Sequence, residues 1–217
     1  MAKAIVIGAG PSLYKFNHLE LLAKSDYDGS LLITDRMLRP CLNMGITPDR
    51  FKGFYVFSME DMFVLKEFYP PTKHASKITV IHSPRVRKEV LEYIVSLGYK
   101  LKCDYWDYLK VTSNVGLMAF CYGWRVLHLK EIAMIGLDHS IYPSPDNLPF
   151  TEDSDCFRSC YTKVGQMIMA PNHQLWLESF IDFLELIPYP IRIINCTEGG
   201  VLKDKRIKEM EFRKYLW

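Results

Sequence analysis

The sequence predicts a single α/β domain, residues 1–217, built on a mainly parallel sheet with helices on both faces. Short apolar runs alternate with segments of helical periodicity along most of the chain, which is typical of strands joined by helical crossovers. The first run, Ala4–Ile7, is uncharged and largely β-branched, as expected of a strand buried on both faces. A length of 217 residues is enough for one such domain with a substantial core.

These patterns place the strands and helices in chain order. The strands are predicted at residues 4–7, 30–34, 53–57, 77–81, 100–103, 131–135 and 191–194, and the last is expected at a sheet edge. The helices are predicted at residues 17–24, 37–44, 60–68, 82–97, 115–127 and 172–187, and from residue 203 onward.

Glycines, prolines and capping residues set the ends of these helices. Gly45 and Gly98 suit the C-terminal ends of the second and fourth helices, because glycine readily takes positive φ. Pro70 and Pro71 end the third helix, since neither can extend its hydrogen-bond ladder. Asn114 and the two hydroxyl residues before it offer side-chain caps at the start of the fifth helix.

Residues 140–171 do not follow the alternating pattern. They lose the periodicity, carry four prolines and include the acidic residues Glu152, Asp153 and Asp155. A structureless connection of this length is unusual inside a compact domain and is often functional. The sequence therefore predicts a long loop with the character of a lid-like insertion near the C-terminal third of the chain.

The composition argues against several classes of partner. The 27 basic and 25 acidic residues leave a formal charge of +2, which gives no reason to expect a nucleic acid or a membrane surface. Six cysteines, without an apolar run long enough for a signal peptide or a transmembrane helix, indicate reduced thiols and a cytoplasmic protein. We therefore expect a small-molecule partner, and a homo-oligomer is left open.

The first strand ends in a turn that suits an anion. This turn consists of Gly8, Ala9, Gly10, Pro11 and Ser12. The glycines turn the chain, the proline fits the first turn of a helix, and the serine adds a hydroxyl beside the free backbone donors. Helix N-termini attract phosphates, so we expect nucleotide binding. The spacing matches neither the dinucleotide fingerprint nor the P-loop, and a tight connection without a ligand remains the alternative.

Charged side chains follow two of the predicted strands. Asp35 comes directly after the second strand, and Asp138 with His139 comes shortly after the sixth. Because ligands bind at the carboxyl ends of parallel strands, both aspartates are candidate ligand-binding residues; a helix cap or a turn is the alternative. His139 is a candidate general base, and His173, at the start of a later helix, could serve from the other side.

Two further segments offer polar groups. Ser113 and Asn114 open the fifth helix, and Thr197, Glu198 and Gly199 follow the last predicted strand. The second segment presents polar side chains and flexible backbone to a base, a ribose or a phosphate. The alternatives are side-chain caps in the first case and a tight turn in the second.

Five motifs occur in order along the chain: GAGPSL, GITPD, SNVGLMA, IGLDHS and NCTEGG. Together they resemble the MptE-like domain family, which is named for the archaeal 6-hydroxymethyl-7,8-dihydropterin diphosphokinase and whose relatives include the bacterial motility accessory factors. The architecture also resembles the sialyltransferases that use CMP-sialic acid. The resemblance implies a Rossmann-like sheet and a nucleotide-using transferase.

The specific reaction implied by the resemblance is the transfer of diphosphate from ATP, as co-substrate, to the alcohol of a 6-hydroxymethyl-pterin. Such a reaction needs Mg²⁺, carboxylates to hold it and donors around the phosphates. The resemblance thus makes Asp35 and Asp138 metal ligands, and Asp138, His139 and His173 catalytic candidates. Ala9 stands where the sialyltransferases usually have asparagine, which favours the diphosphokinase. A glycosyltransferase that uses a CMP-sugar, and a nucleotide-binding module without catalysis, remain alternatives.

Overall fold

The structure is a computed structural model that describes residues 2–59, 65–103, 114–140, 158–162, 165–169, 171–187 and 191–217. Its strands are β1 (Lys3–Ile7), β2 (Ser30–Thr34), β3 (Gly53–Ser58), β4 (Thr79–His82), β5 (Lys100–Lys102), β6 (Glu131–Ile135), β7 (Arg158–Thr162), β8 (Gly165–Met169), β9 (Arg192–Asn195) and β10 (Ile207–Glu209). Its α-helices are α1 (Ser12–Lys15), α2 (His18–Lys24), α3 (Asp35–Asn43), α4 (Leu65–Phe68), α5 (Lys88–Ser96), α7 (Val115–Arg125), α8 (Pro171–Glu185) and α9 (Phe212–Leu216), and a 3₁₀ turn spans Ala75–Lys77.

Eight of the strands form one sheet in the order β10-β9-β6-β1-β2-β3-β4-β5. Every neighbouring pair in this sheet is parallel, so the predicted α/β class with a mainly parallel, Rossmann-like sheet is confirmed. Val6 of the central strand β1 lies opposite Leu32 on one side and Met134 on the other. All three side chains are fully buried, which explains why these strands read as continuous apolar runs.

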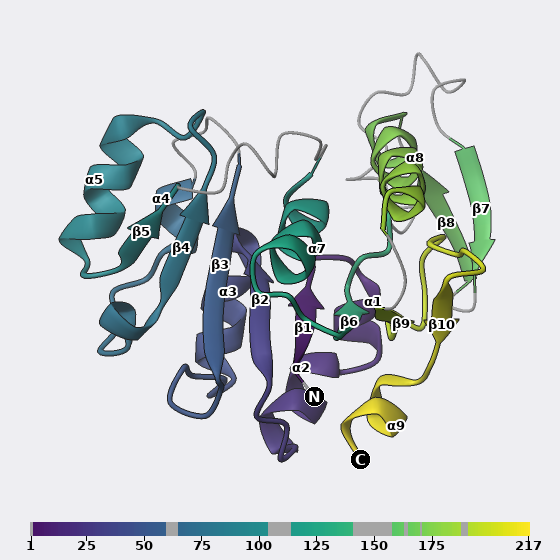
Figure 1. The fold of residues 1–217 in the computed structure, drawn as a ribbon, viewed down its shortest axis with the longest axis horizontal. Coiled ribbons are helices and arrows are strands. Elements are labelled where there is room, and N and C mark those ends of the chain that lie inside the picture. The colour runs from purple at the N-terminus through teal and green to yellow at the C-terminus, as the bar shows by residue number, and fades with distance from the viewer. Residues whose placement is uncertain are drawn as a thin grey trace.

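Two hydrophobic cores cover the two faces of the sheet. On one face, side chains of α1, α2, α3 and α5 pack against alternate residues of the strands, such as Ile5 and Ile33. On the other face, α7 and α8 pack against the intervening residues, such as Val6 and Leu32. Figure 1 shows α7 in front of the sheet and α3 behind it. The expectation of helices on both faces is therefore confirmed, and it follows from the two-residue period of strand side chains.

The C-terminal part of the chain differs from the prediction in three ways. The helix expected from residue 203 is replaced by β10 and the short helix α9. The strand expected at a sheet edge, β9, lies between β6 and β10. Within residues 140–171, β7 and β8 form an antiparallel pair, and Pro171 already belongs to α8. The strands β7, β8 and β10 form because each pairs with a neighbouring strand. They have only five, five and three residues, so the sequence shows no clear periodicity that would predict them.

Smaller differences concern helix ends. The helix predicted at residues 82–97 begins only at Lys88, and the described part of the helix predicted at 60–68 is α4. Most of the predicted lid, together with Ser113, lies outside the described residues.

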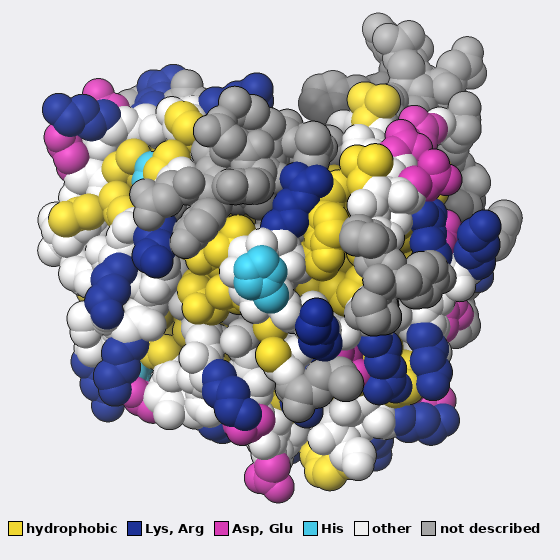
Figure 2. All heavy atoms as spheres, in the orientation of Figure 1, with side chains coloured by type: hydrophobic (Ala, Val, Ile, Leu, Met, Phe, Trp, Pro, Cys, Tyr) yellow, Lys and Arg dark blue, Asp and Glu magenta, His cyan; other side chains and the backbone are white. Residues whose placement is uncertain are grey.

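The surface agrees with the nearly balanced charge. Figure 2 shows Lys and Arg side chains scattered over the visible face, with several over the side that carries the C-terminal strands, and Asp and Glu among them. In the part of the chain that the structure describes, no helix combines the length and the apolar character needed to cross a membrane.

Candidate functional site

The sheet reverses its strand order at β1. From β1 the chain proceeds outward through β2, β3, β4 and β5, then returns on the other side of β1 with β6. The loops that follow β1 and β6 therefore leave the sheet in opposite directions, and open α/β sheets bind ligands at such a reversal. The region around these two loops, residues 8–12 and 136–139, is called the crevice. Both loops carry motifs predicted to be functional, Gly8–Ser12 and the segment that contains Asp138 and His139.

Glycines bring these two loops into direct contact. The amide of Gly8 donates to the carbonyl of Ile135 at 2.9 Å, and the amide of Gly10 donates to the carbonyl of Gly136 at 2.8 Å. A Cβ at Gly10 would lie 1.9 Å from Oδ2 of Asp138. The loop approach thus requires a residue without a side chain at this position.

The Asp138 carboxylate lies in the crevice and binds the beginning of α1. Its Oδ2 accepts hydrogen bonds from the amide of Ser12 at 3.3 Å and from the hydroxyl of Ser12 at 2.8 Å. Its other oxygen, Oδ1, is buried and has no hydrogen-bond partner among the described residues. Asp138 is 1% exposed, and this burial raises the pKa of its carboxyl to about 6 although the bonds from Ser12 oppose the rise.

The beginning of α1 therefore differs from the predicted phosphate cradle. The helix has only four residues, and Pro11 precedes it at the N-cap position. Its Ser12 donors are directed to a carboxylate of the same chain. Ala9 is exposed at the tip of the turn. The turn still lies at the predicted crevice, but Asp138 already provides the negative charge that the helix start attracts.

The N-terminus of α7 lies beside the same turn. Leu137, which follows β6, packs against both Gly8 and Gly116. Asn114 caps α7, because its Oδ1 accepts a hydrogen bond of 2.9 Å from the amide of Leu117. Its Nδ2 is buried without a partner in the described part of the chain. The predicted capping role is confirmed, and one amide donor is left at this end of an eleven-residue helix.

The two candidate histidines lie in the same region. His139 has a positive φ of 50°, is 9% exposed and packs against the ring of Phe180 in α8, with 6.1 Å between ring centroids. Burial lowers its pKa to about 4, and the charge of His173 contributes to the lowering. Burial also lowers the pKa of His173. Both imidazoles are therefore mainly neutral at neutral pH.

Hydrogen bonds to the Glu198 side chain hold the turn after β9 in place. Glu198 has a φ of 60°, and its Oε1 accepts hydrogen bonds from Nε2 of His18 at 3.3 Å and from the amide of Phe212 at 2.8 Å. These bonds join the turn to α2 and α9. Thr197 is fully buried, and within the described residues its Oγ1 has no partner. Gly199 lines an adjacent cleft.

Both carboxylate oxygens of Asp35 accept hydrogen bonds from residues outside the crevice. Its Oδ1 accepts a hydrogen bond from the amide of Arg36 at 2.8 Å, and its Oδ2 accepts one from the hydroxyl of Ser58 at 2.9 Å. The same hydroxyl contacts the hydroxyl of Tyr69 at 2.6 Å. Asp35 thus belongs to a buried polar network on the α3 side of the sheet, and it is the first residue of α3 rather than its N-cap, which is Thr34.

The predicted metal ligands are Asp35 and Asp138. No group of three or more His, Cys, Asp or Glu side chains is placed to hold a metal ion in the part of the chain that is described. Mg²⁺ that binds together with a nucleotide usually takes only one or two carboxylates, and phosphates and waters complete its shell. The unpartnered Oδ1 of Asp138 fits this requirement, whereas both oxygens of Asp35 already accept hydrogen bonds.

Sequence reasoning did not identify His18, Lys203 and Lys208 as parts of this region. His18 binds Glu198, and both lysines line the cleft beside the turn after β9. The lysines lie in a segment that was predicted to be a helix, so nothing in the sequence placed them at the carboxyl edge of the sheet. The acidic partner of His18, Glu198, is 180 residues away in sequence, so no local pattern identifies the pair.

The sheet order and the crevice define a Rossmann-like α/β protein. The chain belongs to the MptE-like family, because the family described as "6-hydroxymethylpterin diphosphokinase MptE-like" matches residues 1–143. This match covers β1 to β6 and therefore includes both loops of the crevice. The resemblance inferred from the five motifs is thereby confirmed.

The fold is also similar to that of a solved structure, the MAf glycosyltransferase from Magnetospirillum magneticum AMB-1. The TM-score is 0.67 and the sequence identity 13%, and the match covers 98% of this chain. The chain spans 34% of the length of that protein, so the likeness concerns the fold. A search of curated proteins finds no match. Family and fold together support a transferase-like role.

Proposed function

We propose that this protein is a nucleotide-using transferase that holds the phosphates of its nucleotide in the crevice between β1 and β6. The observation that carries this proposal is the contact of the Gly8–Ser12 turn with the loop containing Gly136 and Asp138, at the point where the strand order reverses. Ligands of open α/β sheets bind at such points. The family membership supports the same class of reaction.

The phosphate donors of this proposal come mainly from α7. The first amides of an α-helix have no partner within the helix, and their dipoles favour an anion. Gly116 lets Leu137 pack closely at this helix end, where a Cβ would lie 2.6 Å from Cδ2 of Leu137, and Nδ2 of Asn114 is an additional donor. Ser12 contributes less directly, because its donors hold Asp138.

The specific reaction we propose is the transfer of diphosphate from ATP to the alcohol of a 6-hydroxymethyl-pterin, with Mg²⁺. The family description supports this choice. Oδ1 of Asp138 is the protein ligand proposed for the metal, which would neutralise charge on the phosphates. His139 and His173 are the proposed acceptors of the alcohol proton; both are mainly neutral near neutral pH.

A second candidate is a glycosyltransferase that uses a CMP-sugar. It is favoured by the fold similarity to the MAf glycosyltransferase over nearly the whole chain. In this reaction the same histidine pair would serve as base toward a sugar hydroxyl. The two candidates differ in the nucleotide and in the need for metal, and these differences can be measured by ligand-induced stabilisation.

The test is a thermal-shift panel of ATP, GTP, CTP and CMP, each with and without Mg²⁺. The proteins are the wild type, Asp138→Asn, and Asp28→Asn as a control at an exposed, surface-paired aspartate. A Mg²⁺-dependent shift with ATP that Asp138→Asn abolishes and Asp28→Asn retains supports the diphosphokinase. A metal-independent shift with CMP favours glycosyl transfer. The absence of any shift contradicts the nucleotide site.

A further inference from the structure

A cavity lies beside the crevice, at the C-terminal edge of β9 and β10. Its volume is about 680 Å³, which is in the range of small-molecule binding sites. The turn after β9, the end of β10, the residue after α1 and helix α9 form its walls. Its lining includes Phe16, Lys203, Lys208 and Met210.

Three lysines and three glutamates line this cavity, and they are not all paired with one another. Each glutamate is engaged within the chain. Glu198 binds His18 and the amide of Phe212, Glu211 pairs with Lys214 at 2.9 Å, and Glu209 also has a partner. In contrast, Lys203 and Lys208 have no ion-pair partner in the described parts of the chain. Two ammonium groups are therefore available to an anion.

The cavity and the crevice share one wall. The turn after β9 lines the cavity through Gly199, Gly200 and Val201. The amide of Val201 donates to the backbone carbonyl of Asp138 at 3.0 Å, and Gly200 lies so close to Asp138 that a Cβ there would be 2.4 Å from its Cα. Asp138 itself does not line the cavity. The two sites are thus adjacent and separate.

We propose that this cavity binds an anionic small molecule that carries a phosphate or a carboxylate group. The cavity is separate from the proposed nucleotide site, so this inference does not depend on the proposed reaction. Lys203 and Lys208 bind the anionic group, and Phe16 and Met210 provide apolar surface for the remainder of the molecule. An uncharged ligand would leave both lysines without a partner.

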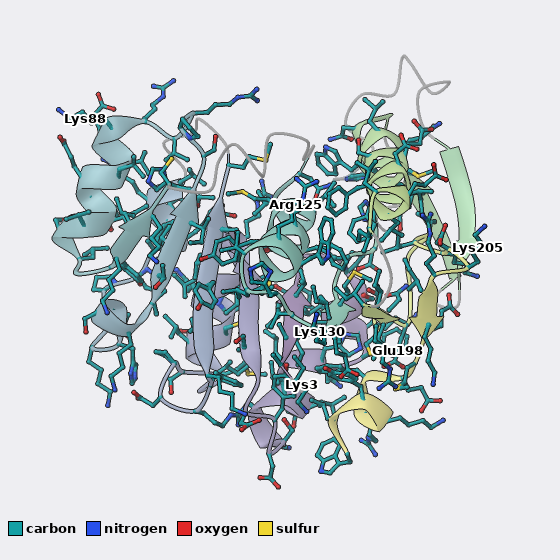
Figure 3. The ribbon with its side chains drawn as sticks, in the orientation of Figure 1. Lys3, Lys88, Arg125, Lys130, Glu198 and Lys205 are labelled. Carbon is teal, nitrogen blue, oxygen red and sulfur yellow. The ribbon has the colours of Figure 1, made fainter. Side chains whose placement is uncertain are left out.

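The surroundings offer a matched control. Lys205 lies between the two lysines in sequence, is exposed, and does not line the cavity. Figure 3 shows Lys205 at the outer margin of the view and Glu198 close to α9. The replacement Lys205→Gln removes one positive charge close to both lysines in sequence and leaves the cavity lining unchanged, so it tests whether a general positive surface is enough for binding.

The experiment titrates pyrophosphate and malonate into the full chain by calorimetry and follows backbone amides by NMR. The proteins are the wild type, the double variant Lys203→Gln/Lys208→Gln, and Lys205→Gln, each checked by thermal unfolding. The double variant is expected to weaken binding by at least about tenfold, and Lys205→Gln by less than about twofold. Amides of residues 199–203 and 208–210 are expected to shift. The tighter of the two probes identifies the anionic group.

Three results would overturn the proposal. One is the absence of pyrophosphate and malonate binding in the millimolar range, and another is equal weakening by Lys205→Gln. The third is a response confined to amides of residues 8–12 with unchanged affinity in the lysine double variant, because the anion would then bind only in the crevice. The nucleotide panel reports on Asp138 and this titration on the lysines, so either proposal can fail alone.

Discussion

The hydroxyl of Ser12 donates a hydrogen bond of 2.8 Å to Oδ2 of Asp138, and this bond joins two loops that are 126 residues apart in the chain. The bond lies at the point where the strand order of the sheet reverses. It also fixes a buried carboxylate whose second oxygen has no partner among the described residues. A buried group with a shifted pKa in a ligand-binding crevice is a candidate functional residue on physical grounds.

Gly10→Ala is expected to destabilise the protein by about 1–3 kcal/mol, because the added Cβ overlaps the Asp138 carboxylate and the carbonyl of Gly136. The same variant should lose any nucleotide-induced stabilisation. Urea unfolding measures the first effect and thermal shift the second. Ala9→Ser, at the exposed neighbouring position, is the control and should change stability little. Unchanged stability in Gly10→Ala would contradict the close loop contact.

Asp138 is expected to make the protein less stable as the pH rises. Its folded pKa, about 6, lies above the ordinary aspartate value of 3.8, so its contribution is fully present below about pH 4 and is lost as the pH passes about 6. The loss amounts to at most about 3 kcal/mol. Asp138→Asn should remove this dependence when unfolding free energies are compared at the two ends of that range.

The control for this measurement is Asp204→Asn. The hydrogen bond and charge of Arg206 lower the pKa of Asp204, so its contribution has the opposite sign and is lost as the pH falls. A wild-type curve that changes in the same way in both variants would contradict the assignment to Asp138.

The contribution of His139 to the unfolding free energy is expected to have the opposite pH dependence to that of Asp138, over nearly the same pH range. Burial lowers its folded pKa to about 4 from 6.5, so its contribution is present above about pH 6.5 and is lost as the pH falls through about 4. His139→Asn keeps a residue type that tolerates positive φ, and it should expose the downward slope due to Asp138. His128→Asn is the matched control, because His128 has a φ of 51° but is exposed. The two histidine variants should therefore differ in their pH dependence of unfolding.

Glu198→Ala is expected to cost about 2 kcal/mol, since it removes the acceptor for buried His18 and for the amide of Phe212. The loss should also loosen α9, which hydrogen exchange of the Phe212 amide can report. Glu211→Ala removes only an exposed pair with Lys214 and should cost less than about 1 kcal/mol. Equal losses of unfolding free energy in the two variants would contradict the role of Glu198 in holding the turn after β9 to α2 and α9.

Much of the sheet was predictable from local pattern. The strands at residues 30–34 and 131–135 have the predicted bounds, because buried parallel strands are continuous apolar runs that end in turn residues. The capping role of Asn114 was predictable for a similar reason, since its acceptor atom reaches an amide three residues ahead. These features depend on residues close together in sequence.

The C-terminal strands and the pairing of the loops were not predictable in this way. β10 has three residues, too few for a period, and it exists because it pairs with β9. The prediction of a helix from residue 203 was wrong because the charged residues there suit either structure. In the same way, Glu198 was predicted as a candidate ligand-binding residue, and its bond to His18 depends on how α2 lies against the turn.

The sequence by itself determined the α/β class, the alternation of strands and helices and the glycine-rich turn after β1, because each depends on local propensity and hydrophobic period. Only the tertiary structure decided that Ser12 binds Asp138, that Asp35 binds Ser58 instead, and that two lysines face a cavity next to the crevice. The physical reason is that these contacts join segments whose separation in space is fixed by strand order, which no local pattern specifies.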